Sequence, residues 1–168
     1  RTGYNINNIC RDGQIDMARL MAGSEGTFGV FTKITLKTVH VPKTKALAQI
    51  DFDTMSAMAR AVPVIANSGA SACELMDSTL IKMAADALPQ YKDIFNPNCA
   101  ASLLVEHTAE SHEQLEQKLN NTLEKISHLN SGTRKVTDPE NQKRLWKSRK
   151  DAVPLLYREK GPKHPIAF

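Results

Sequence analysis

The amino-acid sequence predicts a protein that mixes α-helices and β-strands, because strand-like and helix-like segments alternate along most of the chain. From Ala46 onward, each strand-like run is followed by a run with helical spacing of its apolar residues. On this pattern alone, strand–helix–strand crossovers favour α/β packing. The chain has 168 residues, which is enough to bury a sizeable core and by itself suggests one domain.

The first part of the chain predicts a loop, a short helix and a strand. Residues 1–13 are rich in Asn and Gly and lack periodicity, so we expect a loop there. Residues 15–22 have helical spacing and are followed by Gly23, a common residue after a helix end. From residue 30 to residue 41, apolar and polar side chains alternate as in a half-buried strand. Pro and Lys in residues 42–45 interrupt both periods and indicate a boundary.

The remaining elements are predicted from periodicity and from residues that begin or end helices. Strands are expected at residues 46–52, 72–76, 100–107, 133–137 and 166–168, of which residues 100–107 read as a strand buried on both faces. Helices are expected after caps at Asp53 or Thr54, at Asp77, at Ser111 and at Asp138, the last with a bend or break at Pro154. The helix after Ser111 is the clearest, with leucine and isoleucine recurring every three or four residues.

The composition argues against several classes of function. The net charge of +4 is scattered among acidic residues, and only 5% of residues are aromatic, so we expect no nucleic-acid partner. No apolar run approaches the length that spans a bilayer. The three cysteines are far apart and the five histidines lack ligand spacing, so we expect reduced thiols and no metal site.

A glycine-rich turn, residues 23–29, is the segment that could bind a ligand. Its three glycines are spaced by three, with small hydroxyl residues between them, so backbone N–H groups stay open to an anion or a cofactor edge. The spacing is neither the G-x-G-x-x-G dinucleotide motif nor a P-loop. Two formal GxxG loops lack basic residues, and Glu25 would repel phosphate. Spacing alone therefore favours a tight connection between two packed elements.

The identities of the residues in and around this turn are more informative than the spacing of its glycines. Four segments carry this signal: Arg-Thr-Gly-Tyr-Asn-Ile at residues 1–6, Leu-Met-Ala-Gly-Ser-Glu-Gly-Thr-Phe-Gly-Val at 20–30, Glu-Leu-Met-Asp at 74–77, and Leu-Trp-Lys-Ser-Arg-Lys-Asp-Ala at 145–152. In this order they closely resemble the FAD-linked oxidases, flavoenzymes of the vanillyl-alcohol-oxidase type. That family includes D-lactate dehydrogenases and the glycolate oxidase flavin subunit. The matches cover most of the chain.

The resemblance implies a different fold from the one that the pattern favours. It implies an α+β fold, a ferredoxin-like cap domain whose largely antiparallel sheet is flanked by helices. Residues 1–42 would be the C-terminal remnant of an FAD-binding domain. Residues 43–168 would be the N-terminal part of the C-terminal cap domain, which binds substrate. The chain is then expected to be an internal section of a longer enzyme and to be inactive by itself.

The resemblance also implies a function for the whole enzyme. A 2-hydroxy acid, with D-lactate, glycolate and 2-hydroxyglutarate left open, would lose hydride to FAD, and the electrons would pass to another acceptor. The partners would be the rest of its own two domains and an iron–sulfur protein or fused domain. The enzyme would lie in the cytoplasm, with peripheral attachment to the inner face of a membrane as a further option.

The resemblance assigns site residues within this chain. FAD would contact the turn and its flanks, at Gly23, Ser24, Glu25, Gly26, Thr27, Gly29, Val30, Gly3 and Tyr4. Arg149 would bind the substrate carboxylate, a role that suits the two parallel hydrogen bonds of a guanidinium. Val153 stands where some members carry a hydrogen-bonding Thr, and Lys163 or His164 would replace a lysine. The chain itself would supply no catalytic residue.

Several residues have structural explanations, and one alternative function remains open. Glu74 and Asp77 fit a strand end followed by a helix cap better than a catalytic pair of carboxylates. His107 is expected to be a structural histidine, and Trp146 a core residue of the last helix. The alternative is a non-catalytic ferredoxin-like module for ligand sensing or subunit association. Such a module would have no use for residues 1–42, whereas a flavoenzyme would need them.

Overall fold

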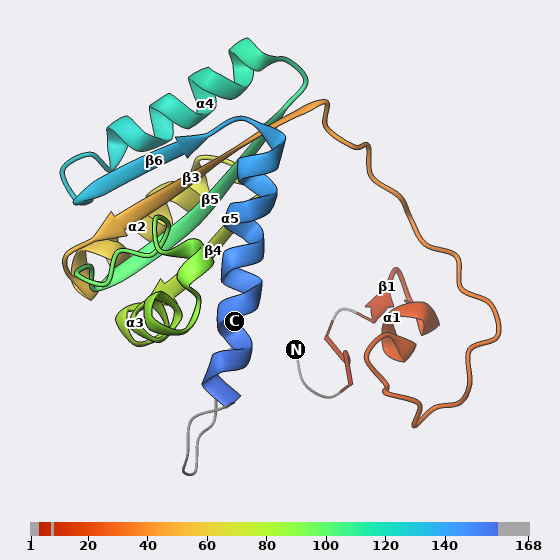
Figure 1. The fold of residues 1–168 in the computed structure, drawn as a ribbon. Coiled ribbons are helices and arrows are strands. Elements are labelled where there is room, and N and C mark those ends of the chain that lie inside the picture. Colours follow the sequence, from red (N-terminus) through yellow and green to blue (C-terminus); the bar gives the residue numbers. More distant parts are fainter. Residues whose placement is uncertain (1–3, 8, 158–168) are drawn as a thin grey trace. The chain divides into compact units, whose positions relative to one another are not determined.

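The protein is described by a computed structural model, which covers residues 4–7 and 9–157 (Figure 1). The chain divides into two compact units, Arg1–His40 and Val41–Phe168, and each is described by itself. The division lies next to the boundary expected at residues 42–45. The predicted strand at residues 166–168 lies outside the described residues.

The first unit contains a small hairpin and one short helix. Strand β1 (Cys10–Arg11) pairs antiparallel with β2 (Gln14–Ile15), and helix α1 (Met17–Met21) follows. The Asp16 side chain accepts a hydrogen bond from the backbone N–H of Arg19, which caps α1. The helix is therefore shorter than the predicted residues 15–22, because the hairpin takes its first residue.

The strand predicted at residues 30–41 does not form, and this prediction is wrong for the chain. The whole segment lies outside regular structure, and Val30, Ile34 and Leu36 are exposed. A strand needs a neighbour to accept and donate its backbone hydrogen bonds. No described strand pairs with this segment. The alternation of side chains is present, but the partner strand that would convert it into a ladder is not among the described residues.

The second unit is built on a four-stranded sheet in the order β4–β5–β3–β6 (Figure 1). Its strands are β3 (Thr44–Phe52), β4 (Ala72–Asp77), β5 (Ala101–Ala109) and β6 (Gly132–Val136). Every neighbouring pair is antiparallel. The α+β prediction is confirmed, and the α/β packing favoured by the pattern alone is wrong.

The physical reason for this correction lies in the strand order. Strands β3 and β4 run the same way and are joined through helix α2 (Met55–Asn67), but β5 lies between them. In the same way, β5 and β6 are joined through α4 (His112–Lys125) with β3 between them. Both crossovers are thus split by an antiparallel strand, as in the ferredoxin-like β-α-β-β-α-β arrangement.

The other helices of the second unit are α3 (Ser78–Ala87), α5 (Pro139–Ala152), and the 3₁₀ helices η1 (Pro89–Tyr91) and η2 (Val153–Tyr157). The predicted N-caps are confirmed, with Thr54 and not Asp53 before α2. Each capping side chain accepts a hydrogen bond from the backbone N–H three residues later: Thr54, Asp77, Ser111 and Asp138. Helix α5 ends before Pro154, as expected.

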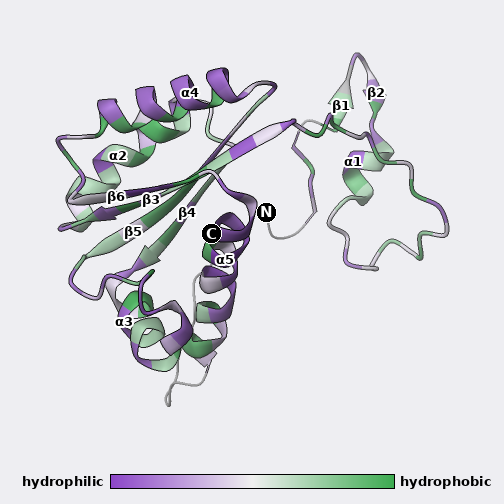
Figure 2. Ribbon diagram, turned by 45° about the horizontal axis from the view of Figure 1, so that its top comes forward, coloured by the Kyte–Doolittle hydropathy of each residue, from purple (hydrophilic) through white to green (hydrophobic). Residues whose placement is uncertain are grey.

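Helices cover both faces of the sheet, so the sheet is the centre of the core. Alternate residues of β3, including Ile50 and Phe52, pack with α2 and α4, whereas Leu47 packs on the side of α3 and α5. Strand β5 is buried on both faces, as the sequence predicts. Figure 2 shows helix α4 with its hydrophobic side toward the sheet and its hydrophilic side outward.

Candidate functional site

In the first unit, Tyr4 contacts the glycine-rich turn, so two segments that were predicted to bind FAD lie together. The Tyr4 hydroxyl donates a hydrogen bond to Thr27 Oγ1 over 3.0 Å. The rings of Tyr4 and Phe28 are stacked, with centroids 4.6 Å apart. The Thr27 hydroxyl in turn donates to the carbonyl oxygen of Ser24 over 2.7 Å. Tyr4 therefore lies against the turn, although 23 positions separate it from Thr27 in the sequence.

Glycine occupies three positions of this turn where φ is strongly positive, Gly23, Gly26 and Gly29. Gly26 has φ of +83° and Gly29 has φ of +144°, values that residues with a Cβ rarely adopt. A Cβ built at either position meets no atom within 4 Å, so the space beside the backbone is open. Ser24 is buried, and its Oγ has no hydrogen-bond partner. The turn thus has open space beside its backbone and an unsatisfied hydroxyl buried within it.

The remaining predicted residues of this segment are placed as follows. Gly23 begins the turn with φ of +85°, and Glu25 also has a positive φ, of 49°. Both are exposed, as is Val30. Gly3 lies outside the described residues.

Arg149, the predicted substrate-binding residue, lies on α5 and is paired with Glu74 of β4. Arg149 Nη2 is 2.6 Å from Glu74 Oε2, and the side chains are 24% and 34% exposed. Arg149 Nε is buried and has no hydrogen-bond partner. The guanidinium is therefore held through Nη2, and the side chain as a whole keeps some exposure to solvent. Both residues stand out in the sequence, but no pattern there pairs them.

A second polar link lies beside this ion pair. Trp146 Nε1 donates to Glu106 Oε2 over 3.2 Å, and the Ser71 hydroxyl donates to Glu106 Oε1 over 3.0 Å. Trp146 also packs against the buried cluster on this side of the sheet, as expected for a core residue. The carboxylate of Glu106 is thus occupied on both oxygens.

Helix α5 is fixed at its two ends as well. Gln142 Nε2 donates to the carbonyl oxygens of Lys45 and Thr137, over 2.9 and 2.8 Å. The Tyr91 hydroxyl donates to Asp151 Oδ2 over 2.7 Å. These contacts hold the helix that carries Arg149 against β3 and η1. No sequence pattern predicted these contacts; an uncharged Gln within a helix otherwise rich in charge was the available signal.

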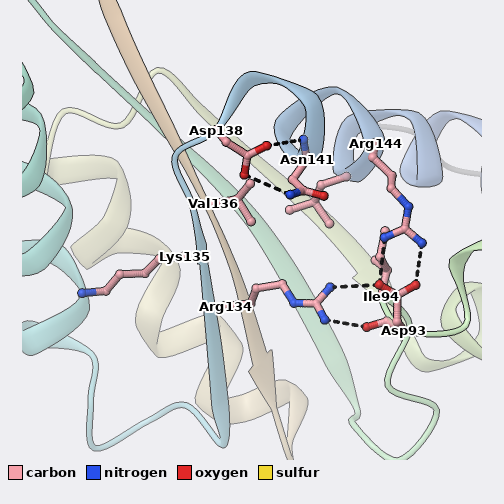
Figure 3. Close-up of a pocket in the computed structure, with 9 residues that line it drawn as sticks. Asp93, Ile94, Arg134, Lys135, Val136, Asp138, Asn141 and Arg144 are labelled. Atoms are coloured by element: carbon pink, nitrogen blue, oxygen red, sulfur yellow. Dashed lines mark hydrogen bonds and ion pairs between the residues drawn. The ribbon is translucent and has the colours of Figure 1, made fainter.

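A cavity of about 320 Å³ lies on the same side of the sheet, between β6, α5 and the loop after η1 (Figure 3). Its central group is Asp93, whose two carboxylate oxygens accept hydrogen bonds of 2.8 and 2.5 Å from Arg144. Arg134 Nη2 donates to the backbone carbonyl of Asp93. The hydrogen bonds from Arg144 hold the pKa of Asp93 well below its usual value, at about 2. Asp93 thus links Arg134 of β6 to Arg144 of α5, and the charged groups of this cavity form a structural network.

The other candidates have structural roles. Asp77 caps α3, as predicted, with Oδ1 2.8 Å from Leu80 N. His107 is fully buried, and its Nε2 lies 3.1 Å from Thr122 Oγ1. Burial, and then the charge of Lys118, lower the pKa of His107, so it is neutral and structural.

Residues 4–7 and 9–157 form neither a cluster of metal ligands nor a membrane-spanning helix. No three His, Cys, Asp or Glu side chains of these residues are grouped to hold a metal ion. None of the helices they form is both long and apolar enough to cross a membrane.

Comparisons with known proteins agree with the antiparallel fold. A family model described as FAD linked oxidases, C-terminal domain, matches residues 41–168. The D-2-hydroxyglutarate dehydrogenase of Escherichia coli (strain K12) is 23% identical over 99% of this chain and 18% of its own length. The mitochondrial D-lactate dehydrogenase [cytochrome] of Arabidopsis thaliana is 31% identical over 84% of this chain and 24% of its own length. The chain thus spans only about a fifth to a quarter of these curated relatives.

Among solved structures, an alkyldihydroxyacetonephosphate synthase is similar with a TM-score of 0.59. The match covers 86% of this chain and 29% of the other, at 15% identity. This likeness supports the fold.

Proposed function

Because the chain belongs to the FAD-linked oxidases through their C-terminal domain, we propose that it is part of an FAD-dependent enzyme that oxidises a 2-hydroxy acid. The substrate is D-lactate or D-2-hydroxyglutarate, the acids in the names of the relatives. The chain contributes part of the cofactor site from its first unit and a substrate-binding arginine from its second. By itself it does not catalyse the reaction, because it holds only part of both sites.

Support for a flavoenzyme over a non-catalytic module comes from the first unit. The similarity to the Escherichia coli relative extends over 99% of the chain and so includes residues of the first unit. A ligand-sensing or association module built on the second unit alone would not need them. Together with the family match to residues 41–168, this favours a flavoenzyme.

The glycine-rich turn fits a role in cofactor binding. The open space at Gly26 and Gly29 lets another molecule approach the backbone, and the buried Ser24 hydroxyl lacks a partner. Tyr4 and Thr27 hold the turn from one side. When bound in the whole enzyme, FAD supplies the acceptor for the hydride that leaves the substrate. The role of the turn is to position the cofactor through backbone groups.

Arg149 is the observation that carries the substrate assignment. Its side chain is three-quarters buried on a fixed helix, is held by one carboxylate, and stays partly exposed. A second carboxylate, that of a 2-hydroxy acid, can bind to its remaining N–H groups. Val153 lies one turn further along the chain and cannot add a hydrogen bond, so the arginine is the main anchor in this segment.

Two wider features of the enzyme are also part of the proposal. The electrons pass from the flavin to a separate acceptor, which we propose is an iron–sulfur protein or fused domain. The enzyme lies in the cytoplasm or at the inner face of a membrane. Reduction of candidate acceptors by the purified enzyme, and fractionation of cells, test these two points.

The test of substrate binding is Arg149→Lys in the full-length enzyme, with bound flavin measured first. Losing a two-point charged contact costs about 1.5–3 kcal/mol, so kcat/KM for the 2-hydroxy acid falls at least about tenfold. Flavin content stays normal, because the residue is not in the glycine-rich turn. The matched control is Arg60→Lys, which changes an exposed arginine of α2. Unchanged kinetics of the Arg149 variant toward D-lactate and D-2-hydroxyglutarate would contradict the proposal.

A further inference from the structure

Glu74 is a carboxylate on a mostly apolar surface of the sheet. In register it pairs with Leu104 of β5, which is fully buried, and Met76 on the same face of β4 is also buried. A charge in such surroundings loses hydration, which is unfavourable unless an opposite charge is in contact. Arg149 supplies that charge from α5, with Nη2 2.6 Å from Glu74 Oε2. The position of this carboxylate therefore depends on Arg149, and that of the guanidinium on Glu74.

The neighbouring carboxylate is engaged with other partners. Glu106 lies on the adjacent strand and faces the same helix, but Trp146 and Ser71 occupy its two oxygens. Within the part of the chain that the structure describes, the ion pair of Arg149 is with Glu74. Glu74 is thus a specific partner for the guanidinium.

We infer that Glu74 is a positioning residue, which holds Arg149 in the orientation that binds the substrate carboxylate. This inference rests on the proposed function. An arginine side chain has many rotamers, and ordering one on binding weakens affinity. Glu74 orders it beforehand through Nη2, and the pair is still partly exposed. The substrate then binds a guanidinium that is already in place.

The backbone of α5 does not depend on this ion pair. Gln142, Trp146 and Asp151 each anchor the helix through hydrogen bonds to other elements. Loss of the Glu74 charge therefore releases the Arg149 side chain and leaves its helix in place. For this reason we expect a change in substrate affinity with little change in the catalytic step.

The test is Glu74→Gln in the full-length, flavin-loaded enzyme. We expect KM for the 2-hydroxy acid, and Kd for its 2-oxo acid product measured by flavin absorbance, to rise about threefold to tenfold. We expect kcat to change less than about twofold. In an Arg149→Lys background the same change adds no further increase, because the residue it positions is altered. Glu74→Asp, which keeps the charge, recovers part of the affinity and replaces Glu74→Gln if that variant is unstable.

A matched control and the opposing outcomes make the test decisive. Glu106→Gln makes the same chemical change on the adjacent strand, and its effect on KM is expected to add to that of Arg149→Lys. If Arg149→Lys lowers kcat/KM but Glu74→Gln leaves KM and Kd unchanged, the positioning role is wrong and the proposed function stands. A lower KM in Glu74→Gln would show instead that Glu74 competes with substrate. If Arg149→Lys has no effect, the substrate assignment itself fails.

Discussion

Asp93 offers a measurable test of the ion-pair network in Figure 3. Its carboxylate lies in the loop after η1 and accepts two hydrogen bonds from Arg144 of α5. It also lies 3.9 Å from Arg134 Nη1 of β6. Asp93→Asn removes the charge and keeps the size of the side chain. We expect the variant to be less stable, because two cations lose their shared anion while the fold around them is unchanged.

The size of the effect follows from the pKa of Asp93, which is lowered from 3.8 to about 2. Taken fully, this difference corresponds to about 2.5 kcal/mol at neutral pH. The Asp93 side chain is 56% exposed, however, so solvent screens the interaction. The expected loss of unfolding free energy is therefore only about 0.5–1 kcal/mol.

The sign of the pH dependence is also determined. Because the pKa of the folded state is the lower one, the unfolded state binds more protons below about pH 4. The stabilising contribution is complete above that pH and disappears as the pH falls through about 2. The difference between the wild-type chain and Asp93→Asn should therefore be constant from pH 7 to pH 5 and smaller at pH 3.

The assay is urea unfolding of the chain at these pH values, with Asp86→Asn as a control. Asp86 is an exposed residue of α3, and its variant should lose no stability. Added NaCl should reduce the effect of Asp93→Asn, since it screens exposed charges. Equal midpoints for wild type and Asp93→Asn at pH 7, or a difference that does not shrink at pH 3, would refute this account of the network.

Two further predictions concern a buried histidine and the glycine-rich turn. Burial, followed by Lys118, lowers the pKa of His107 in the folded chain, so the unfolded state binds more protons below its ordinary pKa of about 6.5. Urea midpoints of the chain should fall between pH 7 and pH 5, and His107→Gln should weaken this fall; an equal fall in both would contradict the assignment. In the full-length enzyme, Gly26→Val should deplete bound flavin, because Val is strained at φ of +83° and its side chain fills the open space. Gly69→Val introduces similar strain at φ of +76° in the other unit and should leave the flavin absorbance normal; loss of flavin in both variants would point to general misfolding.

The sequence predicted the individual elements of the second unit well, because their signals are local. The cap at Ser111 and the leucines that follow determine a helix face whatever the rest of the chain does. The apolar run of β5 likewise indicated a strand buried on both sides. Periodicity could not place the strands in the sheet, however, and alone it favoured the wrong packing. The antiparallel sheet was expected only from the resemblance to a family.

For the candidate site too, the sequence indicated single residues but not the contacts between distant ones. The glycines of the turn and Arg149 could be singled out from sequence because residue types at given positions carried the resemblance. Glu74 was noted as part of a strand end, but its partner lies 75 positions further along. The pairing of Asp93 with Arg144, 51 positions apart, was not foreseen either. Ion pairs between distant segments depend on where helices cross the sheet, which local patterns do not contain.

Residues 30–41, with their alternating apolar and polar side chains, show most clearly what local sequence patterns cannot predict. By itself the sequence determined which side chains of this segment are apolar and, through the capping residues, where helices α2 to α5 begin to within about a residue. Only the tertiary structure decided that this segment pairs with no described strand, that β5 lies between β3 and β4, and that Glu74 meets Arg149. Local conformation depends on neighbours in the chain, whereas ladders and ion pairs require a partner that folding brings from elsewhere.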